Sequence, residues 1–173
     1  MSEFLAYKQV GERRYREQYG LNFEQFEVGQ RFKHRPGLTL SQQDNKNEAL
    51  ETLNQAMLHY DADYAAQTEW KKNLSVSTLT LQVVIGMTSK TFGKKVRVSS
   101  FEDIAMTHPV YGGDTLYAES EILGKEEYPE SPDLGLLSVL TQGINENGDV
   151  VCKITYKMLV YRAGKDPFDR VNY

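Results

Sequence analysis

Apolar residues crowd one stretch of the chain and alternate with polar residues in the stretches that follow it. Residues 74–92 form the most apolar run, with apolar side chains on nearly every side of a helix, and Gly93 is placed to end it. The hydroxyls of Ser75, Ser77 and Thr78 offer capping oxygens at its start. This pattern predicts a long helix over residues 74–92 that is buried on all sides.

The alternating stretches after this run are typical of antiparallel strands. In residues 150–162, Cys152, Ile154 and Tyr156 belong to an apolar face, and the opposite face is mostly polar. The Asn147-Gly148 pair before it is the signal of a tight hairpin. The strands that we expect cover residues 96–110, 115–125, 134–145 and 150–162, with a turn at Tyr111–Asp114 after the first.

Turn and capping signals divide the chain before the apolar run. Residues 30–40 have strand character on either side of Pro36-Gly37, which marks a turn or a bulge. Ser41-Gln-Gln-Asp44 then fits the capping pattern of a helix over about 41–53, whose apolar face would include Ala49, Leu50 and Leu53. Asp61 could cap a second, short helix over residues 62–66.

Together these elements predict an α+β architecture, in which a curved antiparallel sheet of about five strands encloses one long buried helix. Such an open sheet leaves edges and a bare face, so we expect a homodimer or a higher oligomer of dimers. Residues 22–162 would form a single domain. Residues 1–21 would be an extension, either helical or not, against the body or a partner, and residues 163–173 a surface-bound or loose tail.

Composition narrows the class of protein. A chain of 173 residues with 40% hydrophobic and 25% charged residues is ordinary for a soluble globular domain. Its net charge of −4 argues against nucleic acid and anionic membranes as partners. A single cysteine, Cys152, allows neither an internal disulfide nor a multi-cysteine metal site, which indicates the cytoplasm. Neither a signal peptide nor a run of about 18 apolar residues is evident.

The candidate chemistry centres on His59. It lies five residues after Asn54 and two before Asp61, and it is the one of three histidines with polar neighbours that could orient it. A positioned histidine is a natural proton carrier near neutral pH. From spacing alone a structural role remains open. We expect the other histidines to be structural: His34 on the surface, and His108 at a strand end, exposed unless a dimer neighbour brings it to a site.

Four segments, in order, resemble one family. They are Phe26-Glu-Val-Gly-Gln30, Thr39-Leu-Ser-Gln-Gln-Asp44, Leu58-His59-Tyr-Asp61-Ala-Asp-Tyr64-Ala65 and Pro109-Val-Tyr-Gly-Gly-Asp114-Thr-Leu116. Together they resemble the MaoC-like dehydratases and R-specific enoyl-CoA hydratases, over residues 22–162. The resemblance implies a hot-dog fold and an acyl-CoA substrate, with neither a cofactor nor a metal.

Two departures from the family pattern stand at the expected site. Where the hydratase signature reads Asp-x-Asn-Pro-Leu-His, this chain reads Asn54-Gln-Ala-Met-Leu-His59, so the histidine matches but an asparagine replaces the aspartate. An asparagine cannot act as a general base. An asparagine at this position, followed by Leu-His, resembles the pattern of the mesaconyl-CoA hydratase-like branch, whose substrates are branched or dicarboxylic thioesters. The segment before the apolar helix also lacks the family's glycine, although a helix N-terminus still offers free N–H groups.

The resemblance implies reversible hydration of a 2-enoyl-CoA thioester. His59 would move the proton, Asn54 would hold the water, and Asp44 or Asp61 could supply an acid–base partner. Helix capping is the favoured role for Asp44 and an equal alternative for Asp61. The segment with Ser75, Ser77 and Thr78 would bind the thioester oxygen. A thioesterase centred on Asp44 or Asp61, and a silent binding subunit, remain as alternatives.

Other residues favour structural roles. Cys152 is expected to be an inert core thiol, and Gly112-Gly113-Asp114 a turn rather than a phosphate loop. Trp70 and the tyrosines would pack the shell or an interface, with some bordering an acyl pocket. The lysines that could meet CoA phosphates, although a solvated surface is favoured for each, are Lys71, Lys72, Lys94 and Lys95.

Overall fold

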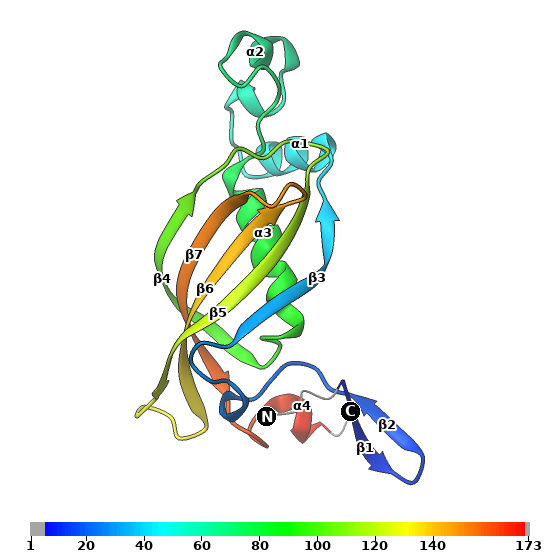
Figure 1. Cartoon of the computed structure of the whole chain (residues 1–173), viewed down its shortest axis with the longest axis vertical. Helices are drawn as coiled ribbons and strands as arrows, with labels where there is room; N and C mark the ends of the chain where they lie inside the picture. Colours follow the sequence, from blue (N-terminus) through cyan, green and yellow to red (C-terminus); the bar gives the residue numbers. More distant parts are fainter. Residues whose placement is uncertain (1–5, 172–173) are drawn as a thin grey trace.

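Five strands form one antiparallel sheet that curves along helix α3 (Ser77–Met87) in the computed structural model, which describes residues 6–171 (Figure 1). The strand order is β3-β5-β6-β7-β4, so β3 and β4 are the two edges. The bounds are β3 (Arg31–Thr39), β4 (Lys95–Met106), β5 (Thr115–Glu127), β6 (Leu134–Asn145) and β7 (Val150–Tyr161). The predicted α+β architecture and its meander are confirmed.

The β6–β7 hairpin shows why the pattern of the second half was informative. Cys152, Ile154 and Tyr156 are buried, as the alternation predicts, and the turn between the strands contains Gly148 at a φ of +89°. The Asn145 side chain stabilises the turn, because its Oδ1 accepts hydrogen bonds from the backbone N–H groups of residues 147 and 149, at 3.0 and 2.9 Å. Local turn chemistry and side-chain alternation therefore fix the same register.

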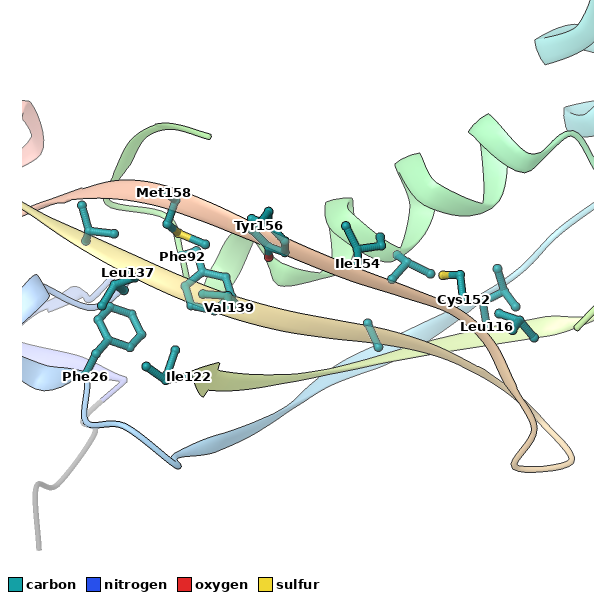
Figure 2. Close-up of a cluster of buried hydrophobic side chains, with 14 of the residues drawn as sticks. Phe26, Phe92, Leu116, Ile122, Leu137, Val139, Cys152, Ile154, Tyr156 and Met158 are labelled. Carbon is teal, nitrogen blue, oxygen red and sulfur yellow. The ribbon is translucent and has the colours of Figure 1, made fainter. Parts of the chain in front are cut away.

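The core lies between the sheet and α3. Figure 2 shows side chains of β5, β6 and β7 on the side of the sheet that α3 covers. Phe26 and Phe92 close one end of this core, with ring centroids 5.6 Å apart. Cys152 is fully buried in it, and burial raises the pKa of its thiol, as expected of an inert core residue.

Helix α3 is shorter and less enclosed than the sequence predicts. It covers residues 77–87, with a 3₁₀ turn, η3 (Thr88–Lys90), after it. Val84 is fully buried, but Gln82 and Gly86 are exposed. The expectation of burial on all sides was wrong, because one five-stranded sheet can cover only one side of a helix. Within residues 6–171, no helix has the length and apolar character needed to cross a bilayer.

The segments at the two ends of the chain pack at one end of the sheet (Figure 1). In the described part of the extension, β1 (Tyr7–Gly11) and β2 (Arg14–Glu17) form a hairpin, so a helical form there was wrong. Its turn contains Arg13, whose φ of 54° breaks any helix. Near the other terminus, the described part of the tail includes α4 (Pro167–Arg170).

A buried polar chain crosses the core, and the surface position expected for His34 was wrong. His34 is only 4% exposed, because the strand β3 that carries it turns this side chain toward the core. Its Nε2 lies 2.9 Å from Ser120 Oγ, which lies 2.7 Å from Thr141 Oγ1; Tyr156 Oη is 3.0 Å further on. The register shift of β3 between residues 34 and 38 confirms the bulge predicted at Pro36-Gly37.

Candidate functional site

The segment around His59 lies at the end of the molecule where α3 begins (Figure 1). Helix α1 (Gln42–Glu51) leads into it, followed by the 3₁₀ turn η2 (Met57–His59) and helix α2 (Ala62–Gln67). The capping predictions are confirmed: Ser41 and Asp44 form a reciprocal capping box, and Asp61 Oδ1 accepts from Tyr64 N at 3.0 Å.

His59 is held by one ring nitrogen. Its Nδ1 lies 2.8 Å from the backbone oxygen of Leu74. A carbonyl oxygen can only accept, so Nδ1 carries a proton, and in the neutral form of the ring the lone pair is on Nε2. Within residues 6–171, no hydrogen bond occupies Nε2, and the side chain is half-buried. This arrangement suits a group that accepts a proton from a ligand.

Two asparagines that the sequence patterns did not indicate hold the His59 segment. Asn45 is fully buried, and its Nδ2 donates to the backbone oxygens of His59 (3.0 Å) and Leu74 (2.9 Å). Asn73 Nδ2 donates to the backbone oxygens of Leu58 and Asp61, at 3.0 and 3.1 Å. Both asparagines bind backbone far away in the chain, so no short motif announces them.

The buried face of α1 differs from the predicted one. Asn45 and Ala49, one helical turn apart, are its buried residues, whereas Leu50 and Leu53 are 53% and 82% exposed. The prediction that these two leucines belong to the buried apolar face was therefore wrong. A polar residue one turn before Ala49 was the signal that could have identified Asn45.

Helix α3 begins without a side-chain cap. Val76 is its N-cap, so the prediction that a nearby hydroxyl caps this helix was wrong. The hydroxyl of Ser75 is buried and has no hydrogen-bond partner within residues 6–171. Thr78 Oγ1 instead donates to Glu48 Oε1 at 2.9 Å, toward α1. An uncapped first turn leaves N–H groups and the positive end of the helix dipole for a ligand.

A pocket of about 300 Å³ opens at this helix start. Its lining combines Ser75 and Ser77 with apolar side chains and with His108, whose Nε2 is 3.8 Å from Asp149 Oδ2 at the surface. His59 is not part of the lining, although its hydrogen-bond partner Leu74 is. The full lining is Trp70, Leu74, Ser75, Ser77, Thr80, Met106, Thr107, His108, Pro109 and Val110.

The remaining acid and amide candidates make local contacts. Asn54 Oδ1 accepts from Ala56 N at 3.1 Å, within a tight turn. Asp44 is exposed, and hydrogen bonds from the backbone N–H and the hydroxyl of Ser41 hold the pKa of its carboxyl below the usual value. Asp61 is engaged as the cap of α2. Thus the structure favours capping for both carboxylates.

Two of the lysines expected at the solvated surface contact other side chains instead. Lys94 is buried in an ion pair with Asp166 (3.1 Å) and donates to Asn22 Oδ1, so a surface role for it was wrong. Lys72 Nζ lies 3.9 Å from the centroid of the Tyr111 ring. Residues 111–114 form the predicted turn, closed by Tyr111 N donating to Asp114 Oδ2.

Two further features of the molecule bear on where a metal or a ligand could bind. Within residues 6–171, no group of three or more His, Cys, Asp or Glu side chains could hold a metal ion. A larger hollow, of about 810 Å³, lies between the N-terminal hairpin and the segment around Phe168. It is at the opposite end of the molecule from His59 (Figure 1), so volume alone does not identify the site.

Comparison with known proteins agrees with this fold. The sequence model of the family described as mesaconyl-CoA hydratase matches residues 2–167. The beta-methylmalyl-CoA dehydratase of Chloroflexus aurantiacus is 23% identical over 119 residues, which are 69% of this chain and 34% of that protein. The chain therefore spans about a third of the length of that curated relative.

Solved structures show the same fold. A MaoC-like dehydratase from Rhodospirillum rubrum has a TM-score of 0.75 and 21% identity, with 83% of this chain and 98% of that one covered. A Mycobacterium tuberculosis protein with a double hot-dog fold has a TM-score of 0.76 and 22% identity, with 83% and 45% covered. With its hot-dog fold and a family match over nearly its whole length, the chain belongs to the mesaconyl-CoA hydratase family.

Proposed function

We propose that the protein catalyses the reversible hydration of a 2-enoyl-CoA thioester, with His59 as the proton carrier. The single observation that carries this proposal is the 2.8 Å hydrogen bond from His59 Nδ1 to Leu74 O. It fixes the ring beside a pocket-lining residue and places the lone pair of the neutral ring on Nε2. In the hydration direction, the water oxygen adds to C3 as its proton passes to Nε2, and Nε2–H then delivers that proton to C2, so the ring ends neutral.

The start of α3 would stabilise the enolate oxygen that develops on the thioester. Its first turn has no side-chain cap, and the buried Ser75 hydroxyl, without a protein partner within residues 6–171, is available to donate to that oxygen. Ser77 lines the same pocket. Donors that are fixed before the reaction are worth several kcal/mol in such sites. Thr78, which binds Glu48, would contribute its backbone N–H rather than its hydroxyl.

Asn54 would hold the attacking water as a neutral amide. Its Oδ1 is engaged in a turn, which fixes the side chain, and its amide cannot compete with His59 for the proton. Asp61 would act through the conformation of the loop, as the cap that ends it. Asp44 would hold the start of α1 in the same way. No cofactor is needed for this reaction.

The acyl group would be small and branched or dicarboxylic. The family description and the name of the Chloroflexus relative both point to substrates of this kind. The pocket of about 300 Å³ suits a short acyl group better than a long fatty chain. Trp70, Met106 and Val110 would contact its apolar part.

A second copy of the chain would complete the molecule along β4. This edge strand exposes Val96, Phe101, Ile104 and Met106, which are 41–51% exposed. The other edge, β3, is protected against pairing by a proline and a bulge, and its outward residues include basic side chains. A symmetric dimer that pairs β4 with β4 would cover the apolar edge. The cytoplasm remains the expected location, with neither nucleic acid nor membrane as a partner.

The test is an absorbance assay with crotonyl-CoA and mesaconyl-CoA, run in parallel with a thiol reagent. Loss of the enoyl absorbance without release of free CoA is the expected result, with mesaconyl-CoA the faster substrate. Release of the thiol would instead indicate a thioesterase. If neither signal appeared with any member of a broad panel of acyl-CoA substrates, the protein would be a silent binding subunit. Size-exclusion chromatography with light scattering tests the dimer.

A further inference from the structure

We infer that Asn45 is a positioning residue that fixes the His59 ring relative to the first turn of α3. This inference rests on the hydration activity proposed above. The mechanism needs two parts from different segments: a base in η2 and oxyanion donors at the start of α3. Asn45, in a third segment, is bonded to both.

Three short hydrogen bonds define the position of the Asn45 side chain. Its Nδ2 donates to His59 O at 3.0 Å and to Leu74 O at 2.9 Å, and its Oδ1 accepts from Val76 N at 2.7 Å. A contact of Nδ2 with Gln42 Oε1 is longer, at 3.4 Å. An amide nitrogen has two protons, so the two backbone oxygens are its main acceptors.

The Leu74 carbonyl connects the amide to the catalytic ring. This oxygen accepts from both Asn45 Nδ2 and His59 Nδ1, which together satisfy its two lone pairs. Val76, bonded to the other end of the same amide, is the N-cap of α3. One rigid, fully buried group thus sets the orientation of the ring and the start of the helix together.

An asparagine is suited to this position for a specific reason. The site requires a donor for two oxygens and an acceptor for one N–H, and an aspartate of the same size has no donor when ionised. Replacing Asn45 by alanine would affect the two backbone oxygens, those of His59 and Leu74, unequally. His59 O would keep the bond from Gln42 Nε2 (2.8 Å), whereas Leu74 O would keep only the imidazole. The ring should therefore lose its alignment before the loop unfolds.

Asn73→Ala provides a matched control. Asn73 also uses one amide to hold two backbone oxygens of the same segment, those of Leu58 and Asp61. It has no hydrogen bond to His59, Leu74 or Val76 in the described part of the chain. A purely structural role of Asn45 predicts similar effects for the two variants, and a positioning role predicts different ones.

The first experiment observes the ring directly. Two-bond ¹H–¹⁵N spectra of the ¹⁵N-labelled full chain identify the His59 tautomer, with His59→Gln to assign its signals. We expect the Nδ1–H tautomer in the wild type and in Asn73→Ala. We expect Asn45→Ala to give a mixture of the two tautomers, because Leu74 O no longer has a fixed position. This readout needs no substrate.

The second experiment measures kinetics on the enoyl-CoA substrate that the wild type hydrates. Asn45→Ala should lower kcat by about 10²-fold with KM changed little, as expected for a misplaced group rather than lost binding. Asn45→Asp keeps the size and the acceptor for Val76 N. Its carboxylate near the ring favours the imidazolium, so the acidic limb of the pH–rate profile should move to higher pH.

The two proposals fail in distinguishable ways. If the wild type hydrates no substrate but shows the Nδ1–H tautomer only while Asn45 is intact, the proposed function fails and the positioning role stands. A wild-type ring without the Nδ1–H tautomer overturns the inference. It is also overturned if Asn45→Ala keeps the tautomer and kcat, or if Asn73→Ala alters both as strongly. If Asn45→Ala does not fold, the shift in Asn45→Asp, or its absence, decides.

Discussion

His34 and His59 are both hydrogen-bonded, but in opposite kinds of surroundings. His34 lies in the core with both ring nitrogens near hydroxyls, Nε2 at 2.9 Å from Ser120 Oγ and Nδ1 at 3.3 Å from Thr91 Oγ1. Hydroxyls can donate or accept, so they suit a neutral ring in either tautomer. Burial, with a smaller contribution from the charge of Arg35, lowers its pKa to about 4.

His59 has a backbone carbonyl for one ring nitrogen and, among the described residues, no partner for the other. A carbonyl fixes the tautomer of the neutral ring, and the side chain is partly exposed rather than enclosed in the core. The difference shows what separates a structural histidine from a candidate catalytic one. The number of hydrogen bonds matters less than whether one nitrogen is oriented while the other stays available.

The largest expected difference in kcat is between the two variants in which one histidine, His59 or His34, is replaced by glutamine. His59→Gln keeps an amide that can donate to Leu74 O but cannot transfer a proton, so kcat should fall by about 10²- to 10⁴-fold. His34→Gln should leave the kcat of the folded protein nearly unchanged and lower its stability. Steady-state kinetics on folded fractions, checked by circular dichroism, measures both. Wild-type turnover in His59→Gln would remove this residue from proton transfer.

Two serines extend the same comparison with a smaller expected effect. Ser75 has a buried hydroxyl with no partner within residues 6–171, whereas Ser120 Oγ links His34 to Thr141. Ser75→Ala should lower kcat by about tenfold if its hydroxyl binds the thioester oxygen, with stability unchanged or slightly higher. Ser120→Ala should lower the free energy of unfolding by about 1–3 kcal/mol, because the buried His34 Nε2 loses this partner and Thr141 Oγ1 keeps only Tyr156 Oη.

Urea unfolding and steady-state kinetics on the same preparations separate these outcomes. The comparison depends on opposite responses: Ser75→Ala should change activity alone, and Ser120→Ala stability alone. If Ser75→Ala were destabilised with its activity intact, the hydroxyl would have a structural role. The candidate oxyanion site would then consist of backbone N–H groups only.

Local signals predicted much of the fold. The strands of the second half alternate clearly, and the turn before β7 uses the Asn-Gly pair that such turns favour. The capping roles of Ser41 and Asp61 depend on residues three positions away, which a sequence displays directly. The family motifs added the position of His59 within this order of elements.

The contacts that build the site were beyond local signals. Asn45 binds backbone 14 to 31 residues away, and His34 binds Ser120 86 residues away. Such partners become neighbours only when the sheet and α3 have formed. A faint signal existed for His34, because it follows Phe32 at strand spacing and so shares its inward face. The Pro36-Gly37 break hid this alternation.

The smallest expected effect is the part of the pH dependence of stability that His34 contributes. Its folded pKa of about 4 is below the ordinary value of 6.5, so the unfolded chain binds the proton more readily between these values. The contribution of His34 to stability is therefore complete above pH 6.5 and is lost progressively as the pH falls toward 4. We expect a loss on the order of 1 kcal/mol at pH 5 relative to pH 7.5.

Urea titrations of the wild type and His34→Gln at these two pH values measure the effect. Acidic residues such as Asp133, whose pKa is lowered by its contact with Lys165, also lose stabilisation in acid, but they contribute equally in both proteins. The difference between the two proteins thus isolates the ring. If the variant lost as much stability as the wild type, His34 would bind its proton equally well in both states. The buried position would then impose no neutrality on the ring, and the contrast with His59 would rest on orientation alone.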